Sequence, residues 1–320
     1  MTTRHLSLLK PTGRLTLGNL LGALRPMAAA QDGADCYYGV ADLHAMTVTH
    51  DPAVLRERTD ELRLLLLAAG LDRSTLFVQS RVPAHTQLSY LLECVATTGE
   101  LSRMIQFKEK GRGVGSTRVS LYTYPALMAA DILLYRPARV PVGDDQRQHV
   151  ELTRDLAQRF NRTYGEVFTV PELVVPAAGA RVMDLQDPRS KMGKSSTDTA
   201  GVIHLLDSPD VVRRKVARAV TDSDTGPDAV RPDRERKPGV SNLLEVLVAC
   251  GGSPAGLTTY GALKRAVTDA VVAVLEPLQQ RYADLATDRA HVADVYAAGA
   301  ARAREVTAPV LAAAEAAVGL

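Results

Sequence analysis

The chain has 320 residues, of which 46% are hydrophobic and 23% are charged, and its formal net charge is +2. This length and composition predict a folded protein of two domains and exclude an intrinsically disordered chain. The small net charge neither requires nor excludes a nucleic-acid partner, because a local basic patch is enough to bind one.

The cysteines and the apolar runs indicate which class of protein this is and where in the cell it is expected. Cys36, Cys94 and Cys250 are far apart and form no C-x-x-C pair, so neither a disulfide framework nor a zinc site is expected. The first residues contain no apolar core of signal-peptide length, and no run is long enough to span a membrane. We therefore expect a soluble cytoplasmic protein with no metal bound directly by the protein.

The first half of the chain alternates short apolar runs with helical patterns. The clearest helix begins at Asp51 and Pro52, which are typical of a cap and a first turn, and ends before Gly70. Strands are predicted at residues 6–9, 36–41, 75–79 and 139–143, and further helices at 16–27, from 88 and at 146–160. Strands and helices in turn predict a doubly wound parallel sheet of the Rossmann-like α/β class, with ligands at the carboxyl ends of its strands.

The pattern changes after Ser196. Ser208 and Pro209 are typical of a helix start, residues 222–239 form a charged loop, and the remainder is almost wholly helical. We predict a Rossmann-like domain over residues 1–200 and an α-helical domain over residues 201–320.

The segment D-P-R-S-K-M-G-K-S-S, residues 187–196, places Lys191 and Lys194 three residues apart. Two ammonium groups this close repel each other unless an anion lies between them. A P-loop is excluded, because Pro188 stands where the pattern G-x-x-x-x-G-K-[ST] has its first glycine. A solvated charged loop is the alternative to an anion site, and the segment taken alone favours it. The basic, glycine-rich segment 108–118 likewise fits a mobile surface loop and a phosphate-touching lid equally well.

Three further segments carry polar residues or glycines where a ligand could bind. Gly18 and Gly22 share one helical face beside Asn19, which fits a phosphate at a helix start as well as ordinary packing by small residues. Asp131 stands in the apolar segment T-Y-P-A-L-M-A-A-D-I-L-L-Y, where a carboxylate needs donors from a core partner or from a ligand N–H. In V-P-V-G-D-D-Q-R-Q-H, residues 140–149, carboxylates follow a strand and suit a ribose, or else cap the next helix.

Together these segments resemble those of the bacterial tryptophanyl-tRNA synthetases, and the resemblance covers the whole chain. T-L-G-N (16–19) is similar to that family's H-I-G-H box, and K-M-G-K-S (191–195) to its K-M-S-K-S loop. The longer blocks V-A-D-L-H-A-M-T-V, M-A-A-D-I-L-L-Y, V-P-V-G-D-D-Q-R-Q-H and A-V-T-D-S are more specific. Tyrosyl-tRNA synthetases have a different sequence around Gln146.

The resemblance implies a Rossmann catalytic domain, with residues 80–125 as a dimerisation insertion, and an anticodon-binding helical domain. It implies that the enzyme joins L-tryptophan to tRNA(Trp), through an adenylate formed from ATP with Mg²⁺, and that it is a homodimer. The catalytic residues would be Lys191, Lys194 and Lys110, acting on the phosphates. The ATP-binding residues would be Lys10, Pro11, Thr12, Gly18, Asn19, Gly143, Asp144, Asp145, Val182, Lys191, Met192, Gly193, Lys194 and Ser195.

For tryptophan, the resemblance implies that Asp131 accepts the indole N–H, which would exclude phenylalanine. Tyr124 and Gln146 would hold the substrate ammonium group, and His44 would lie near the substrate carboxylate. Met128, Leu6 and Leu8 complete the tryptophan-binding residues that the resemblance implies.

This chain also departs from the family at positions that border the substrates. Gly193 replaces the usual serine of K-M-S-K-S, and Leu6, Leu8 and Lys10 replace an aromatic residue, a glycine and a glutamine. These changes suggest an auxiliary form of the enzyme that tolerates tryptophan-mimicking inhibitors. The alternative hypothesis is a synthetase-like paralogue that binds tryptophan, nucleotide or a protein partner without charging tRNA.

Overall fold

The computed structural model describes residues 3–111, 115, 117–137, 139–141, 146–174, 181–193 and 199–320. Its centre is a parallel sheet in the order β1-β2-β3, formed by Thr3–Leu9, Ala34–Val40 and Thr75–Val78. Leu6 lies opposite Tyr37 and Leu8 opposite Gly39. Two short parallel strands, β4 (Arg139–Pro141) and β5 (Glu172–Val174), pair with each other, and β4 also contacts β1.

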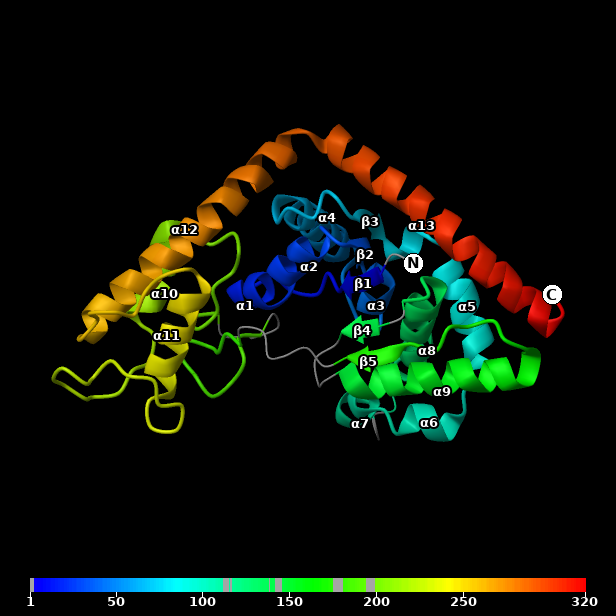
Figure 1. Ribbon diagram of the computed structural model, residues 1–320, viewed down its shortest axis with the longest axis horizontal. Helices are drawn as coiled ribbons and strands as arrows, with labels where there is room; N and C mark the ends of the chain where they lie inside the picture. Colours follow the sequence, from blue (N-terminus) through cyan, green and yellow to red (C-terminus); the bar gives the residue numbers. More distant parts are fainter. Residues whose placement is uncertain are drawn as a thin grey trace.

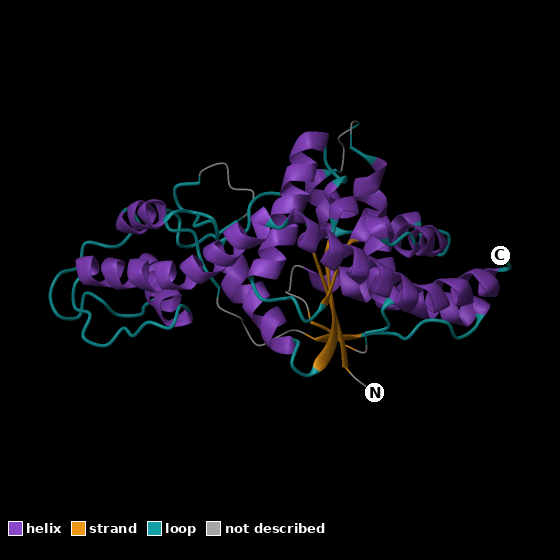
Figure 2. Ribbon diagram, turned by 90° about the horizontal axis from the view of Figure 1, so that it is seen from above, coloured by secondary structure: helices purple, strands orange, loops and turns teal. Residues whose placement is uncertain are grey.

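Helices cover both faces of the sheet, as the view along the sheet in Figure 2 shows. Tyr37 and Phe77 face α5 (Ala84–Glu93), α8 (Val119–Leu134) and α9 (Arg147–Tyr164) in one buried cluster. Residues of alternate strand positions, such as Tyr38, face the opposite cluster, to which α2 (Arg25–Ala30) and α4 (Pro52–Ala68) contribute. Side chains alternate in this way because successive residues of a strand point to opposite faces. The predicted Rossmann-like architecture is confirmed.

The local helix signals were read correctly at α4. The Asp51 side chain accepts a hydrogen bond from the Ala53 backbone N–H at 2.7 Å, and Pro52 occupies the first turn. Gly70 follows the helix with a φ of 82°, a left-handed conformation that favours glycine.

The helix after β1 is less regular than its pattern predicts. It consists of α1 (Leu17–Asn19), a π-helical turn η1 (Leu20–Leu24) and α2. Short π-helical segments inside α-helices occur often at functional sites. Short α-helices elsewhere in the described part of the first half include α3 (Asp42–Ala45), α6 (Thr98–Ser102) and α7 (Ile105–Lys110), and a 3₁₀ turn, η2 (Gln79–Arg81), follows β3.

The second half begins with a helical lobe made of α10 (Pro209–Ala217), α11 (Pro238–Ala249) and α12 (Tyr260–Thr287). The loop before α11 is held by Lys237, which is 2% exposed and whose Nζ lies 2.8 Å from Asp222 and 2.6 Å from Asp224. The charged loop ends sooner than the sequence indicates, because Pro238 begins α11, where its fixed φ and missing N–H are tolerated.

The last helix returns to the sheet. α12 and α13 (Arg289–Val318) form an inverted V over the molecule, with the helical lobe under one arm and the sheet under the other (Figure 1). α13 packs on β3 and α5, and a Cβ added at Gly299 would lie only 1.8 Å from the Leu76 carbonyl oxygen. No helix in the described ranges is long and apolar enough to cross a membrane.

Candidate active site

The two short motifs of the sequence meet at Val182. Gly18 lies beside Val182, because a Cβ added at Gly18 would be in ordinary contact with the Val182 Cβ, at 3.5 Å. The Met192 N–H donates to the Val182 carbonyl oxygen at 3.1 Å, and Met183 forms an antiparallel bridge with Lys191. T-L-G-N and K-M-G are therefore neighbours in space, although more than 170 positions separate them in the sequence.

The start of the first helix is fixed by its own side chains. Asn19 Oδ1 accepts hydrogen bonds from the Thr16 N–H at 3.0 Å and from the Thr16 hydroxyl at 3.1 Å. The Leu17 N–H donates to the Ile203 carbonyl oxygen at 2.9 Å, which ties this helix start to the chain that follows the lysine segment. Asn19 consequently orders the turn, and its side chain is half-buried.

The other predicted ATP-binding residues differ in exposure. Lys10, Thr12 and Lys191 are exposed, whereas Pro11 and Met192 are buried. Gly193 is half-buried, and among the described residues a Cβ added there would meet the Lys191 carbonyl oxygen, at 3.8 Å. Five predicted residues lie outside the described parts of the chain, as does the side chain of Lys110 at the end of α7. These five are Gly143, Asp144, Asp145, Lys194 and Ser195.

Asp131 is the centre of a buried polar cluster on α8. The side chain of Asp131 is 5% exposed, and three donors converge on its carboxylate. His44 Nε2 lies 2.7 Å from Oδ2, while Gln79 Nε2 lies 2.7 Å and His85 Nδ1 lies 2.6 Å from Oδ1. Gln79 directly follows β3, and His44 lies in α3, the short helix after β2. The carboxylate therefore lies at the carboxyl edge of the sheet, where α/β proteins bind ligands.

The surroundings of Asp131 keep it ionised. Burial alone would raise the pKa of its carboxyl group, but the charge attraction to His44 and the hydrogen bonds from His44 and His85 outweigh burial and lower the pKa to about 2. An ionised carboxylate only accepts hydrogen bonds. A group that binds at Asp131 must therefore supply a donor.

The remaining predicted tryptophan-binding residues lie around this edge. Leu6 and Met128 pack against one small cluster of Ile132, Val140 and Val150. Leu8 lies over Gly39, where a Cβ would approach Leu8 Cγ to 3.1 Å. A larger residue on β1 is thus accommodated by the glycine opposite it on β2.

Tyr124 lies beside His44, with ring centroids 6.1 Å apart and nearly perpendicular planes. Its hydroxyl is hydrogen-bonded to His149 Nε2, and burial raises the pKa of Tyr124 to about 12. The phenol is therefore neutral near pH 7 and can donate or accept. Gln146, which precedes α9, is half-buried.

Sequence reasoning missed Gln79 and His85. Both are fully buried polar residues that contact Asp131, and His85 Nε2 also lies 3.0 Å from the Tyr135 hydroxyl. The available signal was weak. Gln79 is a polar residue at the end of a predicted strand, and His85 is a polar residue shortly before a predicted helix. Only the fold brings them to Asp131.

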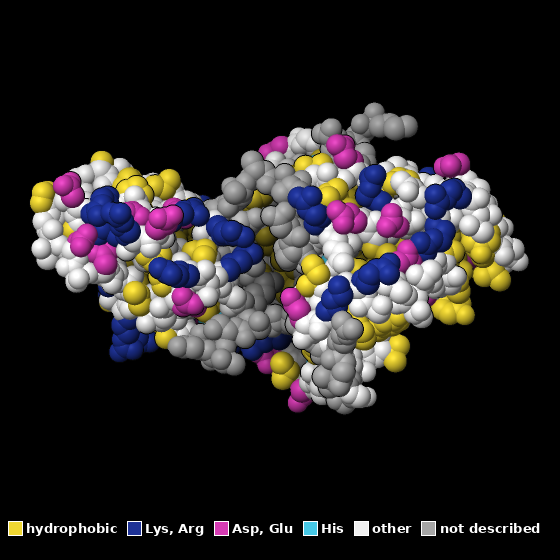
Figure 3. Space-filling model, turned by 90° about the horizontal axis from the view of Figure 1, so that it is seen from below, with side chains coloured by type: hydrophobic (Ala, Val, Ile, Leu, Met, Phe, Trp, Pro, Cys, Tyr) yellow, Lys and Arg dark blue, Asp and Glu magenta, His cyan; other side chains and the backbone are white. Residues whose placement is uncertain are grey.

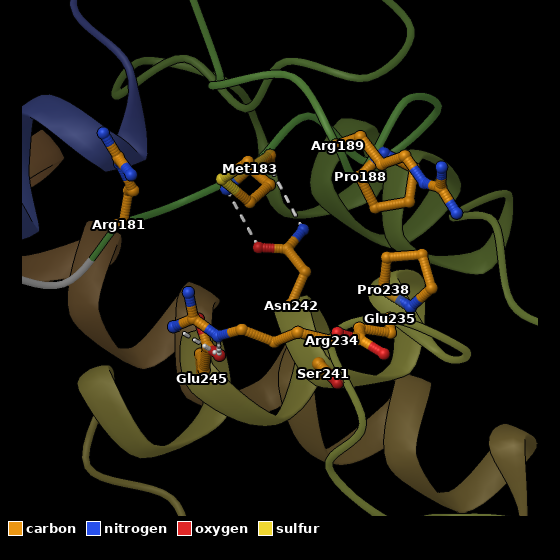
Figure 4. A pocket seen from close by; sticks show the side chains of 10 residues that line it. All are labelled: Arg181, Met183, Pro188, Arg189, Arg234, Glu235, Pro238, Ser241, Asn242 and Glu245. Atoms are coloured by element: carbon orange, nitrogen blue, oxygen red, sulfur yellow. Dashed lines mark hydrogen bonds and ion pairs between the residues drawn. The ribbon is translucent and has the colours of Figure 1, made fainter.

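A cavity of about 460 Å³ lies on the other side of the lysine segment, against α11 (Figure 4). There the Asn242 side-chain amide makes two hydrogen bonds to the backbone of Met183. It accepts from the Met183 N–H at 2.9 Å and donates to the Met183 carbonyl oxygen at 3.0 Å. Arg234 pairs with Glu245 across the cavity wall at 2.9 Å. Among the described residues, none of those predicted to bind ATP lines this cavity. We therefore do not interpret the cavity as the nucleotide site, and we interpret the contacts around it as holding the lysine segment against α11.

On the face of the molecule that Figure 3 shows, positive and negative side chains are mixed. In the view of Figure 3, Lys and Arg side chains are interspersed with Asp and Glu on both lobes, and the surface is hollowed between the lobes. This distribution agrees with the net charge of +2. Any anion site must therefore be local.

The fold and the site define an α/β protein of the Rossmann type, with a ligand-binding carboxyl edge and a lysine segment against its first helix. Its sequence matches the family "tRNA synthetases class I (W and Y)" over residues 2–279. The chain belongs to this family of class I aminoacyl-tRNA synthetases, as its motifs predicted.

The relatives are similar along their whole length. The tryptophan–tRNA ligase 1 of Streptomyces avermitilis is 56% identical, over 99% of this chain and 98% of the relative. The tryptophan–tRNA ligase of Caldanaerobacter subterraneus is 47% identical, over 95% and 94% of the two chains.

Two solved structures support the same assignment. The tryptophanyl-tRNA synthetase of Mycoplasma pneumoniae has a TM-score of 0.88 at 36% identity, covering 100% of this chain and 98% of that chain. That of Campylobacter jejuni, complexed with ADP and tryptophan, has a TM-score of 0.85 at 29% identity, covering 99% and 100%.

Proposed function

We propose that this synthetase activates L-tryptophan with ATP and then transfers the tryptophanyl group to tRNA(Trp). The observation that carries the proposal is Asp131, a buried carboxylate at the carboxyl edge of the sheet that can only accept hydrogen bonds. An indole N–H is a donor of the required kind. The names of the full-length relatives support tryptophan over tyrosine.

In the first step the tryptophan carboxylate attacks the α-phosphorus of ATP, a phosphorus–oxygen bond breaks, and pyrophosphate leaves with its electron pair. The ribose hydroxyl at the 3′ end of the tRNA then attacks the acyl carbon, and AMP leaves. No protein nucleophile takes part, so the protein acts by positioning and by charge stabilisation. Lys191 and Lys194 would hold the β- and γ-phosphates, with Lys110 approaching the same phosphates.

The adenosine would bind where the two motifs meet. Gly18 leaves space beside Val182, whose backbone already orders the lysine segment. Mg²⁺ bound with ATP would offset phosphate charge.

The partners follow from the same proposal. The helical lobe would bind the anticodon of tRNA(Trp), and the insertion at residues 80–125 would form a homodimer interface in the cytoplasm. A monomeric mass in solution would contradict the dimer.

Tryptophan-dependent exchange of pyrophosphate into ATP tests the first step. We expect exchange in the unchanged protein, a loss of at least 100-fold in kcat/KM in Asp131→Asn, and a comparable loss in kcat in Lys194→Ala. Asp210→Asn serves as the matched control, because Asp210 is 80% exposed on α10 and should leave exchange unchanged.

Two outcomes would redirect the proposal. Exchange stimulated by tyrosine instead of tryptophan would refute the substrate. Tryptophan binding without any exchange would favour a paralogue that does not charge tRNA, and Gly193 and Leu8 would be the first residues to change.

A further inference from the structure

The three donors leave one acceptor position free on Asp131. A carboxylate offers about four acceptor positions, two on each oxygen. Gln79 and His85 occupy both positions of Oδ1, whereas His44 is the one donor to Oδ2 among the residues that the structure describes. A ligand N–H is therefore directed to Oδ2.

The pair that fills Oδ1 is itself held rigidly. The His85 ring is 0% exposed, with its centroid 5.8 Å from that of Phe77 at an interplanar angle of 22°. Since Nδ1 faces a carboxylate, the hydrogen-bond pattern assigns the hydrogen to Nδ1. Nε2 is then the acceptor for the Tyr135 hydroxyl at 3.0 Å, and burial raises the pKa of Tyr135, so the phenol keeps its proton.

Gln79 has an arrangement that stability alone does not explain. Its side chain is fully buried and donates to Asp131, while its Oε1 has no hydrogen-bond partner among the described residues. A buried acceptor without a hydrogen-bond partner destabilises the folded state. Residues that break such a rule are found mainly at functional sites.

We infer that Gln79 and His85 are specificity-determining positioning residues: they fill Oδ1 and orient the Asp131 carboxylate so that Oδ2 accepts the indole N–H. This inference rests on the proposed function. It adds to the residues that touch the substrate three that do not: Gln79, His85 and Tyr135, whose hydroxyl is hydrogen-bonded to His85 Nε2.

The test compares tryptophan with its benzothiophene analogue, in which sulfur replaces the indole N–H. The quantity measured is the ratio of kcat/KM for the two amino acids in ATP–pyrophosphate exchange. Gln79→Met and His85→Leu should lower this ratio at least tenfold, mainly through a higher KM for tryptophan. His85→Asn, whose amide can replace the Nδ1 donor, should recover part of the ratio.

Tyr135→Phe provides a milder variant with a matched control. It removes only the hydroxyl that donates a hydrogen bond to His85 Nε2, and we expect a two- to fivefold lower ratio in a folded protein. Tyr37→Phe makes the same change in the same aromatic cluster, with ring centroids 5.0 Å apart, but the Tyr37 hydroxyl donates to Asp35 instead. It should leave the ratio unchanged.

The outcomes separate the inference from the proposed function. If the unchanged enzyme supports exchange with neither amino acid, the proposed function is wrong. If it uses both equally, Asp131 does not distinguish the indole N–H and the inference is wrong, while tryptophan activation stands. If the unchanged enzyme discriminates and Asp131→Asn abolishes this, but the Gln79, His85 and Tyr135 variants keep the full ratio, only the positioning role is refuted. A purely structural role would lower the rates with both amino acids and leave their ratio intact.

Discussion

Replacing Gly299 by alanine should separate α13 from the sheet. The added Cβ would lie 1.8 Å from the Leu76 carbonyl oxygen and 2.7 Å from its carbonyl carbon. Ordinary contact begins near 3.4 Å, so helix and strand must move apart by roughly 1.5 Å. Overpacking of this kind costs about 1–3 kcal/mol, while alanine gains about 1 kcal/mol in helix propensity. Because the obstacle is backbone and cannot rotate aside, we expect the upper end of that range and a net loss of about 2 kcal/mol.

The assay is guanidinium unfolding followed by far-ultraviolet circular dichroism, with the same substitution at Gly261 as a control. Gly261 is an exposed glycine near the start of α12, where a Cβ would meet only the end of the Arg265 side chain, at 3.6 Å. Its replacement should be neutral or stabilising by up to about 1 kcal/mol. Equal stability of the two variants would refute the packing of α13 on β3 described above.

Three further predictions concern single interactions or departures from the family. Hydrogen bonds from Arg159 lower the pKa of Glu100 to about 2. The pair therefore contributes its full stabilisation when the pH is above the ordinary carboxyl pKa of 4.5, and this contribution is lost as the pH falls towards 2. Arg159→Met should cost about 1 kcal/mol at pH 7, given the partial exposure of the pair, and little near pH 2, as pH-dependent unfolding would measure. Gly193→Ser, which meets no obstacle, should raise the exchange rate a few-fold without changing the midpoint of thermal unfolding. Leu8→Gly combined with Lys10→Gln should increase inhibition by a tryptophan mimic at least tenfold, and unchanged inhibition would argue against an inhibitor-tolerant form.

Local signals predicted the elements because each depends on neighbouring residues. Asp51, Pro52 and Gly70 mark the ends of α4 through capping, a fixed φ and a left-handed φ, all of which act within a few positions. The π-helical turn in the first helix could not be predicted in this way. The return of α13 to β3 includes a close approach at Gly299, which in the sequence is one more small residue of an alanine-rich helix.

The site divides in the same manner. Asp131 could be recognised because a carboxylate inside an apolar helix is anomalous on its own. Its donors could not, since Gln79 and His85 lie 52 and 46 positions earlier and meet Asp131 only when β3 and α5 pack against α8. His44 was expected near the substrate carboxylate, and its Nε2 lies 2.7 Å from Asp131.

The positions of Gly299 and Gln79 connect the C-terminal helix to specificity. α13 packs on β3 at the backbone of Leu76, and β3 ends at Val78. Gln79 follows immediately, and its side-chain amide donates a hydrogen bond to Asp131. A shift of β3 would therefore move a donor that fills Oδ1, while leaving the lysine segment, which is held by Val182 and Asn242, in place. Loosening α13 should accordingly weaken discrimination of the indole N–H more than it weakens binding of ATP.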